Sequence, residues 1–292
     1  MTPPGREALP QAFFLPLETH SQRKGQRFCL FHPPGGGIPR GRVLYLHPFA
    51  EELNTTRRVV AQQARALAAA GYAVLQIDLT GCGDSTGDFA DATWTSWLED
   101  AALAHRWLSQ SASGPLWLWG MRSGALLATA LLDKLAEPAH LLLWQPVVNG
   151  QQMLQQFVRL HAASQWLGAG NADEQSPTQR LALGQPVEIA GYTTSPELAA
   201  GLAQSRLQPP ATGAAGRLIW MDITKQADAA LNPSSEREIR VWQKAGWQTE
   251  ARAVIAPSFW QTVTNEDAPA LIRATLAAMT AAHLGAQTTQ RP

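Results

Sequence analysis

The segment Gly120-Met121-Arg122-Ser123-Gly124 has the most informative spacing in the chain. Two glycines with a serine midway between them form the sharp strand-to-helix turn that holds a nucleophilic hydroxyl above a sheet. Here the midway residue is Arg122, and Ser123 comes one position later, where we expect the helix to have begun. A guanidinium stays protonated in proteins and cannot attack a carbonyl carbon. The sequence therefore predicts this turn without its usual nucleophile.

The chain also lacks a histidine where a general base is expected. In this arrangement the base comes from the loop after the last strand, and residues 256–261 (APSFWQ) contain none. The seven histidines lie elsewhere, at His20, His32, His47, His105, His140, His161 and His283. His47 ends a predicted strand, so three roles stay open: a catalytic base for Ser123, a group that shapes a loop or contacts substrate, or a structural residue. Asp222 and Asp228 are the candidate acids, but with no histidine to orient we expect capping or surface carboxylates.

Polar and charged side chains follow the predicted strands at the edge where parallel sheets bind ligands. The residues expected to line a pocket there are His47, Glu51, Glu52, Arg57, Asp78, Asp84, Arg122, Gln145 and Trp260. A guanidinium beneath the pocket suits a carboxylate, a phosphate or an acidic sugar through bidentate hydrogen bonds. Two readings of Arg122 stay open: it binds such an anionic substrate, or it forms an internal ion pair with Glu51 or Glu52 that fills the site.

Strand and helix signals alternate along most of the chain. Runs with strand character cover residues 12–17, 27–32, 42–47, 72–77, 116–119, 140–145, 217–221 and 250–255. Runs with helical periodicity cover residues 55–70, 94–109, 123–135, 234–245 and 268–283. The first two strands should pair antiparallel, and the others should form a parallel sheet with right-handed crossovers. Residues 150–214 interrupt the alternation as a cap-like insertion, and we expect residues 284–292 to be a disordered tail.

This order of elements is the plan of the α/β-hydrolase fold. It predicts one domain over residues 1–292, with a mostly parallel eight-stranded sheet and helices on both faces. A Rossmann domain would need GxGxxG after its first strand, where this chain has HPFAEE. Residues 78–85 (DLTGCGDS) match the DxxGxGxS loop common in the hydrolase fold, whose glycines allow tight turns. No phosphate-loop lysine follows these glycines, and we expect no cofactor.

Bulk composition excludes several classes of function. Lysine plus arginine and aspartate plus glutamate both total 23, so no charge excess favours nucleic acid as a partner. The two cysteines, Cys29 and Cys82, have neither disulfide-scaffold nor metal-ligand spacing, so we expect no metal site. No run of about 18 apolar residues occurs, and the N-terminus lacks a signal-peptide core. The expected protein does not span a membrane and works in the cytoplasm.

Four runs carry a resemblance to one bacterial family. They are residues 46–58 (LHPFAEELNTTRR), 76–89 (QIDLTGCGDSTGDF), 118–128 (LWGMRSGALLA) and 142–160 (LLWQPVVNGQQMLQQFVRL). They resemble the second type of α/β-hydrolase-like protein associated with exosortase A systems, which occurs beside exopolysaccharide and protein-sorting genes. The resemblance extends from about Phe13 to Leu276, and HPFAEE and WQPVV are its most specific parts. It implies a hydrolase name that rests on fold, with Arg122 at the turn as a family trait.

Three kinds of function fit these residues. The first is a hydrolase, esterase or acyltransferase acting on an ester or saccharide-linked substrate of exopolysaccharide or envelope assembly, with a nonstandard set drawn from His47, Glu51, Arg122 and Ser123. The second is a binding protein that has lost the catalytic triad and uses Arg122 for an anionic ligand, or the cap for a partner. The third is a scaffold for an envelope or sorting-system protein.

Overall fold

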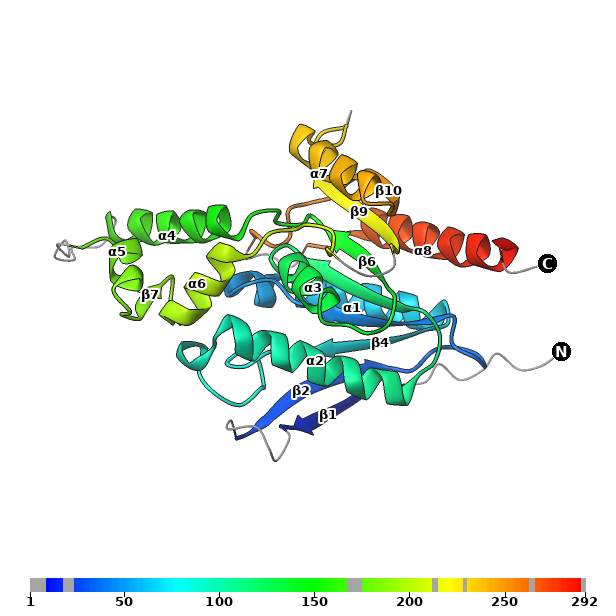
Figure 1. Ribbon diagram of the computed structural model, residues 1–292, viewed down its shortest axis with the longest axis horizontal. Coiled ribbons are helices and arrows are strands. Elements are labelled where there is room, and N and C mark those ends of the chain that lie inside the picture. The colour runs from blue at the N-terminus through cyan, green and yellow to red at the C-terminus, as the bar shows by residue number, and fades with distance from the viewer. Residues whose placement is uncertain are drawn as a thin grey trace.

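The computed structural model describes residues 9–17, 24–166, 175–211, 215–227, 230–262 and 266–289 (Figure 1). In these ranges eight strands form one sheet in the order β1-β2-β4-β3-β5-β6-β9-β10. Its strands are β1 (Gln11–Pro16), β2 (Gln26–His32), β3 (Gly41–Leu46), β4 (Tyr72–Ile77), β5 (Leu116–Met121), β6 (Ala139–Trp144), β9 (Arg217–Thr224) and β10 (Gln248–Ile255). β2 pairs antiparallel with both β1 and β4, and the other pairs are parallel. The predicted α/β-hydrolase fold is confirmed.

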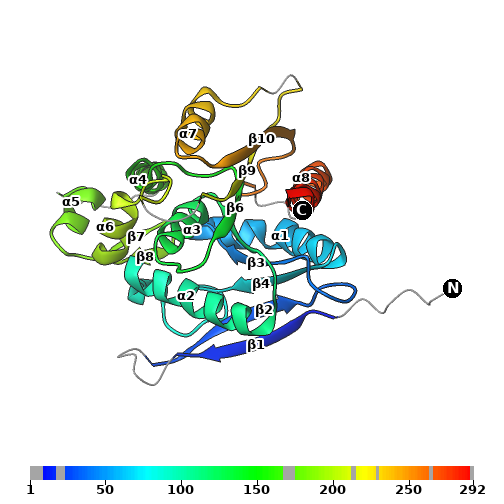
Figure 2. The same ribbon diagram turned by 45° about the vertical axis from the view of Figure 1, so that its right-hand side comes forward.

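Helices cover both faces of the sheet (Figure 2). They are α1 (Glu51–Ala69), α2 (Trp94–Ser111), α3 (Gly124–Leu132), α7 (Pro233–Lys244) and α8 (Pro269–Thr289), with a short 3-10 turn η1 (Phe89–Asp91) before α2. Alternate residues of β3 enter two cores, because successive side chains of a strand point to opposite faces. Leu44 and Leu46 pack in the core under α2, α3 and α7, whereas Val43 and Tyr45 pack in the core under α1 and α8.

Between β6 and β9 the chain leaves the sheet over the predicted insertion. This segment contains α4 (Gly150–Trp166), α5 (Pro177–Ala182), β7 (Val187–Ile189), β8 (Tyr192–Thr194) and α6 (Pro196–Gln204). α6 packs against α2 and α4, and β8 packs against η1, so the insertion lies beside the carboxyl ends of β3 and β4. The antiparallel pair β7–β8 was not predicted from the sequence. Its turn uses Ala190 and Gly191, both at positive φ, which is the geometry of a tight hairpin.

Two boundaries differ from the predicted ones by four residues or more. α1 begins at Glu51, four residues before the predicted start, because its first turn carries Glu51 and Glu52, whose charges suit a helix N-terminus. The predicted disordered tail is wrong for residues 284–289, since α8 continues to Thr289 through an alanine-rich segment. Residues 290–292 lie outside the described ranges. No helix in the described part of the chain is long and apolar enough to cross a membrane.

Candidate functional site

Arg122 occupies the tip of the turn between β5 and α3. Its φ of 53° is left-handed, which costs energy for a side chain with a Cβ. The flanking glycines have no room for side chains: a Cβ at Gly120 would lie 2.5 Å from the Ala125 Cα, and one at Gly124 would lie 2.1 Å from the Leu46 carbonyl oxygen. The structure therefore has the tight, strained turn that the glycine spacing predicts, with a guanidinium side chain at its tip.

Backbone strain is concentrated at this edge of the sheet. Ala50 and Gln145 also have positive φ angles, of 52° and 42°, and they follow β3 and β6, the strands on either side of β5. Strained residues of this kind gather at functional sites, where the surrounding structure holds them in place. The carboxyl ends of β3, β5 and β6 therefore form the candidate site.

Ser123 has the backbone angles of a helix, with φ −66° and ψ −22°. The residue is 4% exposed, and within the described ranges its hydroxyl has no hydrogen-bond partner. A serine nucleophile needs a base within hydrogen-bond reach, and no imidazole or carboxylate of the described residues fills that role here. The geometry gives no support to Ser123 as the catalytic nucleophile.

The Arg122 guanidinium binds the carboxylate of Glu52, from the first turn of α1. Nε lies 3.1 and 3.3 Å from the two carboxylate oxygens, and Nη2 lies 3.1 Å from Oε1. The guanidinium carbon also lies 5.4 Å from the centre of the Trp260 ring, a cation–π contact. Thr55 Oγ1 donates to the Trp260 carbonyl oxygen at 3.1 Å, which ties the backbone of this residue to α1. Of the two readings of Arg122, the structure contains the internal ion pair, with Glu52 as its partner.

Burial governs the charge of this pair. It raises the pKa of the Glu52 carboxyl, while the positive charge and hydrogen bonds of Arg122 act in the opposite direction. The side chains of Arg122 and Glu52 are 16% and 20% exposed, so the pair still meets solvent. Nε and Nη2 are used by Glu52, whereas Arg122 Nη1 has no acceptor among the residues that the structure describes. The site thus retains accessible donors for an acceptor from outside the chain.

His47 has both ring nitrogens occupied by backbone groups. Its Nδ1 lies 2.8 Å from the Pro48 carbonyl oxygen, and its Nε2 accepts a hydrogen bond from the Leu79 amide at 3.2 Å. Burial lowers the pKa of His47, which matches a neutral ring with its proton on Nδ1. These contacts join the loop after β3 to the loop after β4. They favour the loop-shaping role over the role of base for Ser123.

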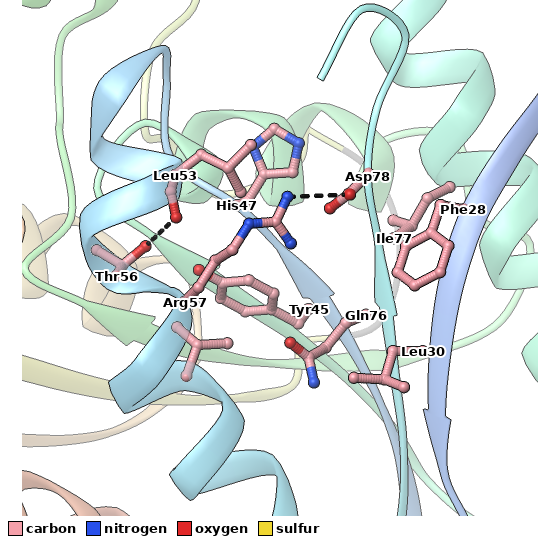
Figure 3. Close-up of a pocket in the computed structure, with 11 residues that line it drawn as sticks. Phe28, Leu30, Tyr45, His47, Leu53, Thr56, Arg57, Gln76, Ile77 and Asp78 are labelled. Atoms are coloured by element: carbon pink, nitrogen blue, oxygen red, sulfur yellow. Dashed lines mark hydrogen bonds and ion pairs between the residues drawn. The ribbon is translucent and has the colours of Figure 1, made fainter. Parts of the chain in front are cut away.

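Arg57 and Asp78 form a second polar group, together with His47 (Figure 3). Asp78 Oδ2 accepts hydrogen bonds from Arg57 Nη2 at 3.0 Å and from the Asp84 amide at 3.1 Å. Arg57, Asp78 and His47 line a cavity of about 40 Å³ under α1, which has room for roughly one to three water molecules. The Asp84 side chain itself is exposed. Tyr45 also lines this cavity and was missed, because its strand reads as uniformly buried core.

Glu51 and Gln145 point to other partners. Glu51 Oε2 accepts from the Tyr192 hydroxyl at 2.7 Å and from Asn54 Nδ2 at 3.2 Å, which ties the start of α1 to the inserted hairpin. Gln145 Oε1 accepts from the Ile223 amide at 2.5 Å. The nine predicted pocket residues therefore do not form one cluster. Sequence reasoning missed Tyr192, and only recognition of the hairpin turn before it would have indicated it.

Asp222, a candidate acid, supports the start of α7. Its Oδ1 accepts from Trp220 Nε1 at 2.7 Å and from Ser235 Oγ at 3.0 Å, and its Oδ2 accepts from the Asn232 amide at 3.0 Å. The N-cap of α7 is Asn232, whose side chain accepts from the Ser234 amide, and Asp222 binds the residues around this cap. Asp228 lies outside the described residues. Among the residues that are described, no cluster of histidine, cysteine and carboxylate side chains could hold a metal ion.

Solved structures with similar folds include a carboxyl esterase. A carboxyl esterase from Bacillus coagulans superposes with a TM-score of 0.61 at 11% identity, over 94% of this chain and 99% of that one. Est1E from Butyrivibrio proteoclasticus, solved with ferulic acid bound, gives a TM-score of 0.60 at 12% identity, over 88% of this chain and 96% of that one. At such identities the likeness concerns the fold alone.

Two kinds of sequence comparison concern the family of this chain, and the family model is the one that decides it. Lysophosphatidylserine lipase ABHD12 of Danio rerio is 34% identical over 112 residues, which are 37% of this chain and 28% of that protein. The same lipase of Xenopus tropicalis is 33% identical over the same shares. The chain thus spans little more than a quarter of the length of the curated relatives it matches. The profile of the family described as serine aminopeptidase, S33, matches residues 37–196, more than half of the chain. The protein therefore belongs to the serine aminopeptidase S33 family of α/β-hydrolase-fold proteins.

Proposed function

We propose that this protein binds an acidic ligand at the carboxyl end of β5 and does not cleave esters with a nucleophile at the turn after β5. The observation that carries the proposal is Arg122 at the tip of this turn, at φ 53° and bound to Glu52. A residue kept in a strained conformation needs a surrounding structure that holds it there, and such strain is typical of functional positions. The ligand class is a carboxylate, a phosphate or an acidic sugar.

The donors of Arg122 support this ligand class. Nη1 has no acceptor among the described residues, and the flat guanidinium lies against the Trp260 ring. A planar fork backed by an aromatic ring is suited to acceptors that offer two oxygens in one plane. Glu52 is the internal carboxylate on the same guanidinium, and an acidic ligand would add to it through Nη1 or replace it.

Thermal-shift measurements test the proposal without knowledge of a reaction. Glucuronate, inorganic phosphate and short-chain carboxylates are compared with glucose at equal ionic strength. A ligand that binds the folded state alone raises the melting temperature. We expect a rise with at least one acid, lost in Arg122→Ala and kept in Arg240→Ala, which removes an exposed arginine of α7. A rise that survives Arg122→Ala contradicts the proposal.

Membership of the S33 family favours a second candidate, ester or amide hydrolysis through Ser123. This function requires Ser123 to leave the helical geometry described above, because a base must lie within hydrogen-bond reach of its hydroxyl. Turnover of short p-nitrophenyl esters that is absent in Ser123→Ala would establish it. Equal rates in the wild type and in Ser123→Ala would exclude it.

The resemblance of residues 46–58 and 142–160 to the exosortase-associated family extends the proposal to the cellular system. If the protein works in that system, its acidic ligand is an intermediate of exopolysaccharide or envelope assembly. The alternative is a scaffold role, which requires an envelope or sorting-system protein as partner. A deletion strain tests the association. Changed exopolysaccharide that is restored by wild type and not by Arg122→Ala supports ligand binding. Full restoration by Arg122→Ala favours the scaffold.

A further inference from the structure

β10 forms one end of the eight-stranded sheet, beside α7 (Figure 2). In the described ranges no strand pairs with its outer edge. The amides of Gln248 and Ala256 donate to Gly216 and Thr224, on the β9 side. Since the direction of backbone groups alternates along a strand, the even-numbered residues face β9. Thr249, Ala251 and Ala253 therefore direct their N–H and C=O groups outward, where nothing described accepts or donates to them.

The two ends of the sheet differ. β1, at the other end, has six residues and finishes at Pro16, which has no amide hydrogen to donate. β10 has eight residues and no proline. A long edge strand without proline is a template for pairing with a further strand. The open end of the sheet at β10 is therefore the better site for strand addition.

The charges on β10 favour a second copy of the same strand. Glu250 and Arg252 lie on one face of β10 and pair with each other, with Arg252 Nε 2.9 Å from Glu250 Oε1. A twofold axis perpendicular to the sheet makes two β10 strands antiparallel and places one residue opposite its own copy. If that residue is Ala251, each Glu250 stands opposite Arg252 of the other copy. Centring on Glu250 or Arg252 would instead oppose like charges, which destabilises a strand pair.

We propose that two copies of this chain dimerise through antiparallel pairing of their β10 strands, centred on Ala251. The pairing joins two sheets into one and uses the outward amides and carbonyls of Thr249, Ala251 and Ala253. On the other face of the strand, Thr249 and Ala251 border an open hollow of about 240 Å³, which Ile239 of α7 and Leu231 before that helix also line. A partner strand laid along the edge closes the open side of this hollow.

Sedimentation over a concentration series tests the dimer. The wild-type chain, at 31.6 kDa, is expected to sediment as a species of twice that mass in the micromolar range, with dissociation on dilution. In the proposed dimer, position 250 of each copy faces position 252 of the other copy. Glu250→Lys therefore sets lysine against Arg252 at both places, and Arg252→Glu sets glutamate against Glu250 at both places. Each variant should raise the dissociation constant by roughly tenfold or more. Arg58→Glu, which reverses a charge in an exposed ion pair with Asp267 away from β10, should leave it unchanged.

Mixing the two single variants is the decisive step. In a mixed pair, lysine at position 250 of one copy faces glutamate at position 252 of the other, and Arg252 of the first faces Glu250 of the second. Both oppositions are then attractive, so an equimolar mixture should recover the wild-type dissociation constant. Wild-type protein that stays monomeric up to about 100 μM would overturn the proposal. So would a dimer that tolerates both single reversals, or a mixture that stays monomeric.

Discussion

The carboxylate of Glu52 takes two of the three nitrogens of Arg122, the residue at the position where this fold usually carries its nucleophile. The ion pair joins α1 to the turn after β5. An internal carboxylate thus occupies the guanidinium that we propose as the ligand-binding group. Glu52 is in this respect a competitor of the ligand, held within the chain.

Removing the charge of Glu52 should strengthen ligand binding. In Glu52→Gln the guanidinium loses its charged partner but keeps a neutral acceptor, so a ligand acid meets less competition. We expect roughly tenfold tighter binding of the acid found by thermal shift, because hydrogen bonds to charged groups contribute about 1.5–3 kcal/mol. Titration calorimetry measures it, with Glu51→Gln as the matched control that removes the neighbouring carboxylate, bound to Tyr192. Equal affinities in the two variants would argue against competition by Glu52.

Acid should destabilise the fold through a partly buried histidine, His140. Burial, with a smaller effect of Arg217, lowers the pKa of His140 to about 4, and Nδ1 accepts the Arg217 amide at 3.1 Å. The unfolded chain has the ordinary value of 6.5, so it binds more protons than the folded chain between these values. The free energy of unfolding therefore falls as the pH drops from 6.5 towards 4, by at most about 3 kcal/mol for this residue. Urea titrations along this pH range should show a shallower fall in His140→Asn; an identical pH dependence would refute the assignment.

The buried ion pair between β2 and α2 should be strongly coupled. Arg27 Nε lies 2.8 Å from Asp100 Oδ1, and the two side chains are 2% and 0% exposed. Removing one partner leaves a buried charge without compensation, which costs about 3–5 kcal/mol. We expect Arg27→Met and Asp100→Leu each to lose this much, and the double variant to lose clearly less than the sum. Additive losses in a double-mutant cycle by urea unfolding would contradict the coupling.

Gly124 should tolerate no side chain. A Cβ there would lie 2.1 Å from the Leu46 carbonyl oxygen, in rigid backbone at the turn after β5. Gly124→Ala should lower the free energy of unfolding by at least about 1–3 kcal/mol, as overpacking does. Gly37→Ala is the matched control, since a Cβ at Gly37 meets nothing within 4 Å. Thermal unfolding compares the two variants, and equal stabilities would show that the turn is looser than described.

The fold was predictable because the signals for it are local. Buried strands such as 42–47 and helices with apolar spacing alternate at lengths that only a mostly parallel sheet accommodates. The pair β7–β8 was not predicted, because strands of three residues are too short to show the alternation of polar and apolar residues that identifies a strand. The extension of α8 to Thr289 was not predicted from the sequence. The alanines favour a helix, whereas the glycine and threonines near the end of α8 disfavour one.

The site was predictable in its backbone and much less in its side chains. The spacing of Gly120 and Gly124 places Arg122 at the tip of the turn. A Cβ at either glycine would collide with backbone atoms, of Ala125 or of Leu46, so only glycine fits at these two positions. The partners of each side chain depend on rotamers that no pattern encodes. Glu51 and Glu52 are adjacent on α1, yet one binds Tyr192 of the insertion and the other binds Arg122.

Covalent labelling tests most directly whether a guanidinium has replaced a nucleophile at the turn after β5. The purified protein is incubated with a fluorophosphonate, and intact-mass spectrometry compares the wild type with Ser123→Ala. With Arg122 at the tip and Ser123 in helical geometry without a base, we predict no adduct in either protein. An adduct on the wild type that disappears in Ser123→Ala would contradict the account.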